Sequence, residues 1–248
     1  SSREKSVPLG LVMSIAEHVD GSERAACTAD LIQLALFFCL RSCEYSKTSS
    51  HRRTTQFRLR DMQFHNKHGV IPRDAPDDAF LTATAITLFL DTQKNCVRGE
   101  SSTHEATGFI HGDPVPAGAR RFIHLRSNNA DPDTPICCFF ATPTSPIASV
   151  NSQHITDTLR IAAKKLGFQM LGFLPHEIGS HSLRSGGAMT LHLAGISEHT
   201  IKIIGRWRSD AFLIYLQGQI ASFTAGVAAA MAAVPWFTHT APSVMPSG

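Results

Sequence analysis

Residues 180–217, SHSLRSGGAMTLHLAGISEHTIKIIGRWRSDAFLIYLQ, contain the start and stop signals of three short helices. Each predicted helix begins at a serine, a residue type that caps helix N-termini, and the first two end at a glycine. The N-cap candidates are Ser180, Ser197 and Ser209, and the closing glycines are Gly195 and Gly205. This part of the chain therefore predicts three consecutive helices joined by tight turns.

Four side chains of this stretch suit the chemistry of a phosphate group. His181 and Arg184 are three residues apart, so they lie on the same side of the first helix near its N-terminus. Helix N-termini attract phosphate, and a histidine and an arginine there strengthen that attraction. Trp207 follows in the turn before the third helix, and Tyr215 lies on that helix. A cation, a hydrogen-bond donor and a phenol are what attack of tyrosine on a phosphodiester requires.

A second arginine of interest lies near the start of the chain. Residues 25–45 are strongly apolar and predict a helix with one wide buried face. Arg41 and Glu44 stand three residues apart at its end. Taken alone, this pair indicates an ordinary salt bridge or a partner of the helix dipole.

The three motifs together, in chain order, resemble the catalytic blocks of the tyrosine recombinase/integrase family. They are LRSCE at 40–44, HSLRSGGA at 181–188 and GRWRSDAFLIY at 205–215. Their wording is most similar to the Crypton-type recombinases of eukaryotic mobile elements. The resemblance implies the DNA breaking-rejoining fold of a tyrosine recombinase catalytic domain. It also implies DNA integration or recombination through a 3′-phosphotyrosyl intermediate, without a metal or other cofactor.

The resemblance assigns a role to each motif residue. Arg41 and Arg184 bind the phosphate oxygens, and Glu44 holds Arg41 or His181 in place. His181 bonds a phosphate oxygen or accepts the phenol proton. Trp207 donates its indole N–H, and Tyr215 is the nucleophile.

The middle of the chain predicts a small sheet. Strands are expected at 56–64, 83–95 and 121–125, with a loop at 72–78 and a polar, turn-prone piece at 96–108. Together with the helices this gives an α+β class, mainly α, with an antiparallel sheet of about three strands. In the resembled family a lysine at the tip of this sheet protonates the leaving oxygen. Lys94 is the candidate for it here, and Lys67 is the alternative.

The regions outside the motifs predict further contacts. Residues 128–149 are expected to form a loop with a short buried segment, and 152–166 a helix whose exposed Arg160, Lys164 and Lys165 either touch a DNA backbone or are merely solvated. The Ala-rich segment 221–237 is helix-prone, and it packs on its own core or docks on a neighbouring subunit.

The expected domain organisation is simple. Residues 1–237 are expected to form one catalytic domain, without the N-terminal core-binding domain usual in the family, and 238–248 a flexible tail.

Composition limits the class of protein. The 248 residues are 43% hydrophobic and 17% charged, with a net charge of +3, which permits a double-stranded DNA partner without requiring one. The six cysteines show no CxxC pair and predict free thiols. There is no signal-peptide pattern, and the apolar run 227–234 is much shorter than the roughly 20 residues of a membrane span. We expect a soluble, intracellular protein, nuclear if it comes from a eukaryotic mobile element.

Three other classes of protein are alternatives. A metal enzyme is disfavoured, because no His and Cys group has ligand spacing beside a carboxylate. A type IB topoisomerase-like enzyme shares the chemistry but rejoins the same strands. A DNA-binding remnant of a mobile element keeps the fold without the activity.

Overall fold

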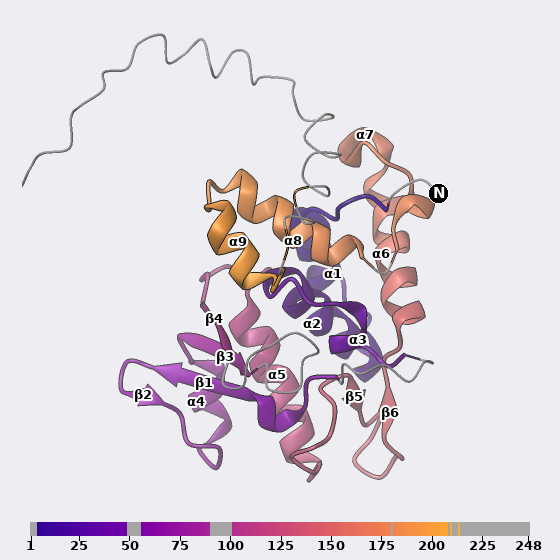
Figure 1. Ribbon diagram of the computed structural model, residues 1–248. Helices are drawn as coiled ribbons and strands as arrows, with labels where there is room; N and C mark the ends of the chain where they lie inside the picture. The colour runs from indigo at the N-terminus through magenta and orange to yellow at the C-terminus, as the bar shows by residue number, and fades with distance from the viewer. Residues whose placement is uncertain are drawn as a thin grey trace, which may run out of the picture.

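The computed structural model describes residues 4–48, 56–89, 101–179 and 181–207, together with Ser209 and Leu213. Within these residues the chain forms a mainly helical α+β fold with nine α-helices and a four-stranded antiparallel sheet (Figure 1). The mixed, mainly helical class expected from the sequence is confirmed, and the sheet has one strand more than expected.

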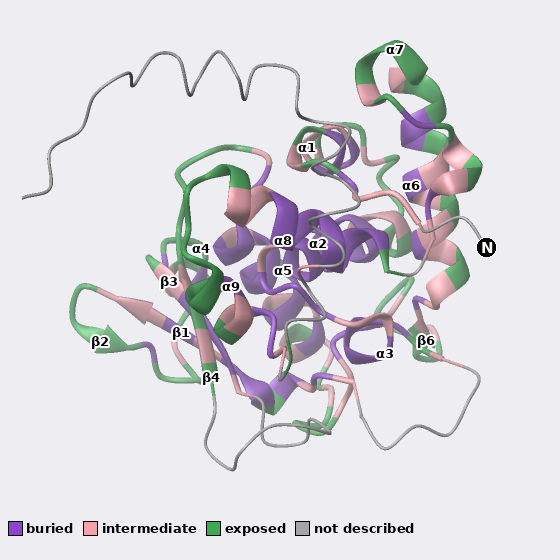
Figure 2. Ribbon diagram, turned by 45° about the horizontal axis from the view of Figure 1, so that its top comes forward, coloured by how far each residue is buried: buried purple, intermediate pink, exposed green. Residues whose placement is uncertain are grey.

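A buried helix, α2 (Glu23–Phe37), lies at the centre of the fold. Ser22 caps it by accepting a hydrogen bond from the Ala25 amide at 3.2 Å, and every residue from Cys27 to Leu36 is buried. A helix that is buried on all sides must be surrounded by other elements. Four helices pack around it, as Figures 1 and 2 show: α1 (Leu9–Glu17), α5 (Pro114–Ser127), α6 (Ser152–Leu166) and α8 (Ser182–Leu193).

The sheet lies on the other side of α5. Its strand order is β2-β1-β3-β4, with every neighbouring pair antiparallel. A Cβ at Gly118 of α5 would lie 2.2 Å from the Ile86 side chain of β3, so this glycine lets the helix approach the sheet closely. The strands are β1 (Met62–Asn66), β2 (Gly69–Val70), β3 (Ala85–Phe89) and β4 (Ser101–Glu105).

Short elements complete the described part of the chain. They are the helices α3 (Ser42–Tyr45), α4 (Asp77–Leu81), α7 (Phe168–Leu171) and α9 (Glu198–Ile204), the 3₁₀ turns η1 (Leu59–Asp61) and η2 (Pro175–Glu177), and the hairpin of β5 (Cys138–Phe139) and β6 (Ala148–Ser149).

Several expectations for single elements are wrong. The helix predicted at 25–45 ends at Phe37, because Cys39 has a left-handed φ of 47° that no helix can contain. The strand predicted at 121–125 is part of α5, which begins directly after its N-cap Asp113. The polar piece at 96–108 contains the edge strand β4, and the loop at 72–78 ends where α4 begins.

The strand boundaries also differ from the prediction. Of the strand expected at 56–64, only the end belongs to β1, since η1 occupies residues 59–61. The strand expected at 83–95 is β3 as far as Phe89, and residues 90–100 lie outside the described part of the chain. In the segment 128–149 the buried piece forms the hairpin of β5 and β6.

Two of the helices predicted from their caps are confirmed, whereas α8 begins at Ser182 with His181 as its N-cap instead of the predicted Ser180. The helix at 152–166 is α6, and its N-cap Asn151 accepts the His154 amide at 2.9 Å. Ser197 caps α9 and Gly205 closes it. The helix expected to start at Ser209 and the one expected at 221–237 lie outside the described residues, apart from Ser209 and Leu213.

Two further findings apply to the described residues only. Among their helices, none is both long and apolar enough to span a bilayer. Cys27, Cys39, Cys137 and Cys138 are buried free thiols.

Candidate functional site

The first part of the site is the turn that follows α2. After the left-handed Cys39 the chain reaches Arg41, which is the N-cap of α3. The Glu44 carboxylate accepts the Arg41 backbone amide at 2.7 Å and pairs with the Arg41 guanidinium at 2.9 Å. Glu44 is wholly buried, whereas the Arg41 side chain is 29% exposed. Arg41 therefore lies in a tight turn instead of on the long helix expected from the sequence.

The second part is the N-terminal half of α8. A Cβ at Gly187 would lie 2.2 Å from the backbone oxygen of Leu36, so a glycine here lets α8 pack directly against the end of α2. This contact brings Arg184 to the turn after α2. Its guanidinium donates to the Cys39 carbonyl and to the Gly205 carbonyl, each at 2.5 Å.

The third part is the turn after α9. The Trp207 ring lies directly on Gly205, where a Cβ would be 1.6 Å from a ring carbon. The same ring has the Arg184 guanidinium carbon 4.2 Å from its centroid, which is a cation–π contact. The Arg184 guanidinium and Gly205 therefore both pack against the Trp207 ring.

Arg206 is a member of the site that the sequence analysis missed. Its guanidinium donates to the Glu44 carboxylate at 2.7 Å and to the Phe38 carbonyl at 3.3 Å, and the residue is 8% exposed. Its backbone is left-handed, with a φ of 55°. Its Nε is buried and has no hydrogen-bond partner in the described part of the chain. No local signature marks such a residue, although it stands within the GRW motif.

We call Arg41, Arg184 and Arg206, gathered around Glu44, the arginine cluster. Glu44 pairs with Arg41 and Arg206 but not with Arg184, so three guanidiniums and one carboxylate leave an excess of positive charge. Arg184 is 7% exposed and has no carboxylate partner among the described residues. Burial, together with the charges of Arg41 and Arg206, lowers the pKa of Arg184 to about 10. A buried cation without a counter-ion is costly, and such a group marks a candidate anion site.

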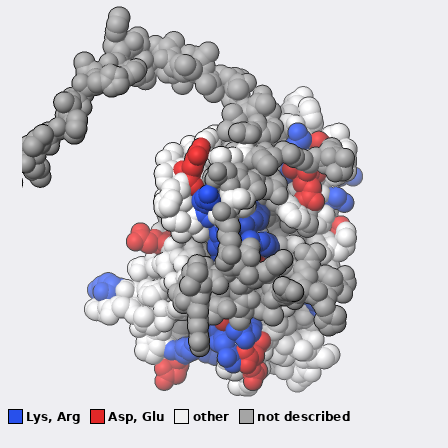
Figure 3. All heavy atoms as spheres, in the orientation of Figure 1, with Lys and Arg blue, Asp and Glu red and all other residues white. Residues whose placement is uncertain are grey.

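A comparison with a second basic region supports this choice. Figure 3 shows Lys and Arg atoms in the middle of one face and a second group at its lower edge, where Asp and Glu atoms are interleaved. The arginines near η1 and α5 are paired with carboxylates: Arg58 with Asp61 and Asp133, Arg60 with Asp133, and Arg126 with Asp77. These three arginines are matched by three aspartates, whereas the arginine cluster has one glutamate for three arginines.

His181 is the N-cap of α8, and it contacts Glu4. Its amide donates to the Glu4 carboxylate at 2.7 Å, and its ring Nδ1 is 3.9 Å from the same oxygen. The His181 side chain is 62% exposed. The structure therefore places His181 on the same helix end as Arg184, beside Glu4.

The two lysine candidates differ in what the structure describes. Lys94 lies outside the described residues, as does Tyr215. Lys67 is exposed in the turn between β1 and β2, and Figures 1 and 2 show this hairpin extending away from α8 and α9. The alternative lysine is therefore remote from the arginine cluster.

The predicted DNA-contacting face of α6 is only partly available. Arg160 donates to the Ile178 carbonyl at 2.8 Å, which ties α6 to the segment before α8. Lys164 and Lys165 are exposed in the last turn of the helix. A DNA contact of these three residues stays a prediction.

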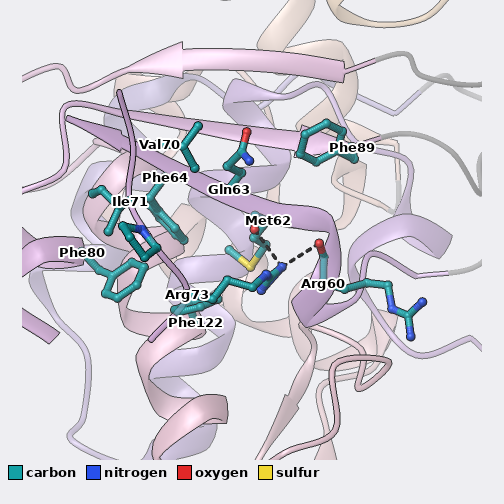
Figure 4. A pocket seen from close by; sticks show the side chains of 11 residues that line it. Arg60, Met62, Gln63, Phe64, Val70, Ile71, Arg73, Phe80, Phe89 and Phe122 are labelled. Carbon is teal, nitrogen blue, oxygen red and sulfur yellow. Dashed lines mark hydrogen bonds between the residues drawn. The ribbon is translucent and has the colours of Figure 1, made fainter. Parts of the chain in front are cut away.

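A cavity under the sheet is a poorer candidate for a site. It has a volume of about 230 Å³ and is lined mostly by apolar side chains of β1 and its neighbours (Figure 4). Arg73 lies in it, but its guanidinium donates to the carbonyls of Leu59, Arg60 and Met62. This arginine is used for packing.

Comparisons of the sequence with models of known protein families and with curated proteins find no match in either. Within the described ranges, no three His, Cys, Asp or Glu side chains form a group that could hold a metal ion.

Proposed function

We propose that this protein cleaves and rejoins double-stranded DNA through a covalent 3′-phosphotyrosyl intermediate, as a site-specific recombinase or integrase. The observation that carries the proposal is the arginine cluster. The sequence resemblance selects Arg41, Arg184 and Trp207. Arg184 contacts Trp207 and bonds the carbonyls of Cys39 and Gly205, which lie beside the ion pairs that Glu44 makes with Arg41 and Arg206. Arg41, Arg184 and Trp207 come from positions up to 166 residues apart. A backbone phosphate is an anion, and a group of side chains with excess positive charge is suited to bind it.

Arg184 has donors left for a phosphate. A guanidinium carries five N–H donors, and two of those of Arg184 are used on carbonyl oxygens. The remaining donors, with the partly exposed side chain of Arg41, suit the nonbridging oxygens on which charge gathers during the reaction. Removal of one such preorganised donor typically costs about 3 kcal/mol of transition-state stabilisation.

The nucleophile follows from the tyrosine inventory. The chain has two tyrosines, Tyr45 and Tyr215. Tyr45 is 1% exposed, and burial raises the pKa of its phenol well above the ordinary value, so it cannot attack DNA. Tyr215 is the candidate that remains.

In the proposed step the Tyr215 oxygen bonds to phosphorus and the bond from phosphorus to the 5′ oxygen breaks. His181 accepts the phenol proton or bonds a phosphate oxygen, and Trp207 donates its indole N–H. Lys94 supplies the proton to the departing oxygen. Strand rejoining is the reverse of this step, so the energy of the broken bond is conserved and no nucleotide is consumed.

A nicked suicide duplex tests the proposal, because the short strand released on cleavage diffuses away and traps the covalent adduct. The wild-type protein should form an adduct that survives denaturation, and Tyr215→Phe should form none. Tyr45→Phe is the matched control and should form the adduct as the wild type does. DNA binding without an adduct would instead indicate an inactive binding remnant. Relaxation of supercoiled DNA without exchange between two sites would indicate a topoisomerase-like enzyme.

A further inference from the structure

Arg206 occupies a position in the arginine cluster for which the phosphate chemistry has no direct use. Its guanidinium is bonded to Glu44 and Phe38, and its side chain is 5% exposed. The Arg41 side chain, on the opposite side of the same carboxylate, is 29% exposed. Of these two cations, Arg41 is the one that an incoming phosphate can reach.

Glu44 needs two cations for the site to remain positive. One carboxylate oxygen accepts from the Arg41 guanidinium at 2.9 Å, and the other accepts from Arg206 at 2.7 Å. With Arg41 as its only partner, the buried Glu44 would neutralise the reachable guanidinium. Because Arg206 compensates the carboxylate from the buried side, the charge of Arg41 stays available.

We infer that Arg206 is a positioning residue that acts through Glu44: it compensates the Glu44 carboxylate and so leaves Arg41 as an uncompensated cation for an oxyanion. This deepens the proposed function and rests on its assignment of the arginine cluster to a phosphate. Arg206 touches no ligand in this role. Its bond to Glu44 also joins the turn after α9 to the turn after α2, which are 162 residues apart.

A charge-restoring pair of variants tests this inference, with inorganic phosphate as the probe. Around Glu44 the wild type has three cations and one anion, Arg206→Gln leaves two cations and one anion, and the double variant Arg206→Gln/Glu44→Gln leaves two cations alone. The excess charge therefore falls in the single variant and returns to the wild-type value in the double variant.

Phosphate affinity, measured by calorimetry at constant ionic strength, should follow the excess charge. Arg206→Gln should weaken it roughly tenfold or more, because one nearby unit charge in a partly buried site has at least this effect. The double variant and Arg206→Lys should both bind within about threefold of the wild type. If the single variant does not fold, Arg206→Lys and the double variant carry the comparison.

Four results would overturn the inference. Arg206 would bind the phosphate itself if the phosphate affinity of the double variant were as low as that of Arg206→Gln. The same would follow if that affinity were tenfold below that of Arg206→Lys. An Arg206→Gln variant with wild-type affinity would mean that the Glu44 charge is irrelevant, and a wild-type protein that binds no phosphate would remove the site. The covalent adduct at Tyr215 is scored separately, so failure of the DNA chemistry is distinguishable from failure of this charge pattern.

Discussion

Arg184→Met should abolish the stabilisation that comes from oxyanion binding at the arginine cluster, while leaving the protein folded without oxyanions. Methionine keeps an apolar stem of similar length and removes the charge. In the wild type, burial and the charges of Arg41 and Arg206 lower the pKa of Arg184 to about 10. The folded state therefore holds this proton less tightly than the unfolded chain does. The resulting cost to folding is present at all pH values below about 10 and decreases as the pH rises above that value.

The opposing contributions are of similar size. A pKa lowered to this extent corresponds to about 3 kcal/mol against the charged form. The variant removes this cost, but it also loses two charge-assisted hydrogen bonds of about 1.5 kcal/mol each and a cation–π contact of about 1–2 kcal/mol. We therefore expect Arg184→Met to lower the free energy of unfolding by only about 1–2 kcal/mol in chloride.

Oxyanion binding adds a term that the variant lacks. At an anion concentration about ten times the dissociation constant, the wild type gains about 1.4 kcal/mol. For a chain of this size that is a rise of roughly 3–6 °C in Tm. The assay is thermal unfolding along a sulfate titration, with chloride at matched ionic strength as the reference.

Arg73→Met is the matched control for this assay. Like Arg184, Arg73 donates to backbone carbonyls and lies over an aromatic ring, 5.4 Å from the Phe122 centroid. Sulfate also stabilises proteins in general, because it is excluded from their surface, and the control retains that general effect. The reasoning is refuted if Arg184→Met keeps the full sulfate-dependent rise, or if Arg73→Met loses as much of it.

Four further substitutions have predicted outcomes. Gly187→Ala should lower the free energy of unfolding in urea by about 1–3 kcal/mol, since the new Cβ meets a backbone oxygen of α2, whereas Gly10→Ala has open space on α1 and should gain about 0.5–1 kcal/mol. Burial lowers the pKa of His104, so the unfolded chain binds the His104 proton more tightly than the folded protein does. The free energy of unfolding should therefore fall as the pH drops below about 6.5. His104→Phe should flatten that fall between about pH 7.5 and about pH 5.5. Glu4→Gln should cost about 0.5–1 kcal/mol of stability at the α8 N-terminus but tighten DNA binding in fluorescence anisotropy, because it removes a carboxylate beside His181; unchanged affinity would contradict this.

Local signals explain which elements were predictable. The helices α6 and α9 begin at Asn151 and Ser197, whose side chains bond amides three residues on, so a few adjacent residues determine these boundaries. The edge strand β4 has the polar sequence SSTHE, and pairing with β3 rather than apolar alternation makes it a strand. The alternation of residues 121–125 predicts a strand when taken alone, but these residues belong to α5, which begins at Pro114.

The candidate site also contains residues that local signals predict and one that they do not. Arg41, Glu44, Arg184 and Trp207 are marked by short motifs, and the structure brings these four together. Arg206 could not be predicted, because its role depends on a left-handed backbone and on a carboxylate 162 residues away. Such a partner is fixed by tertiary packing, which no local pattern reports.

The backbone around the arginine cluster is strained at two points, and Arg184 holds both. Cys39 and Arg206 adopt left-handed φ values of 47° and 55°, which cost non-glycine residues about 1 kcal/mol or more each. Arg184 bonds the carbonyl of Cys39 and that of Gly205, directly before Arg206. One guanidinium therefore both fastens two strained turns and offers charge to a phosphate. Loss of activity in an Arg184 variant cannot separate these roles, whereas sulfate-dependent stability can, because strain is present with or without the anion.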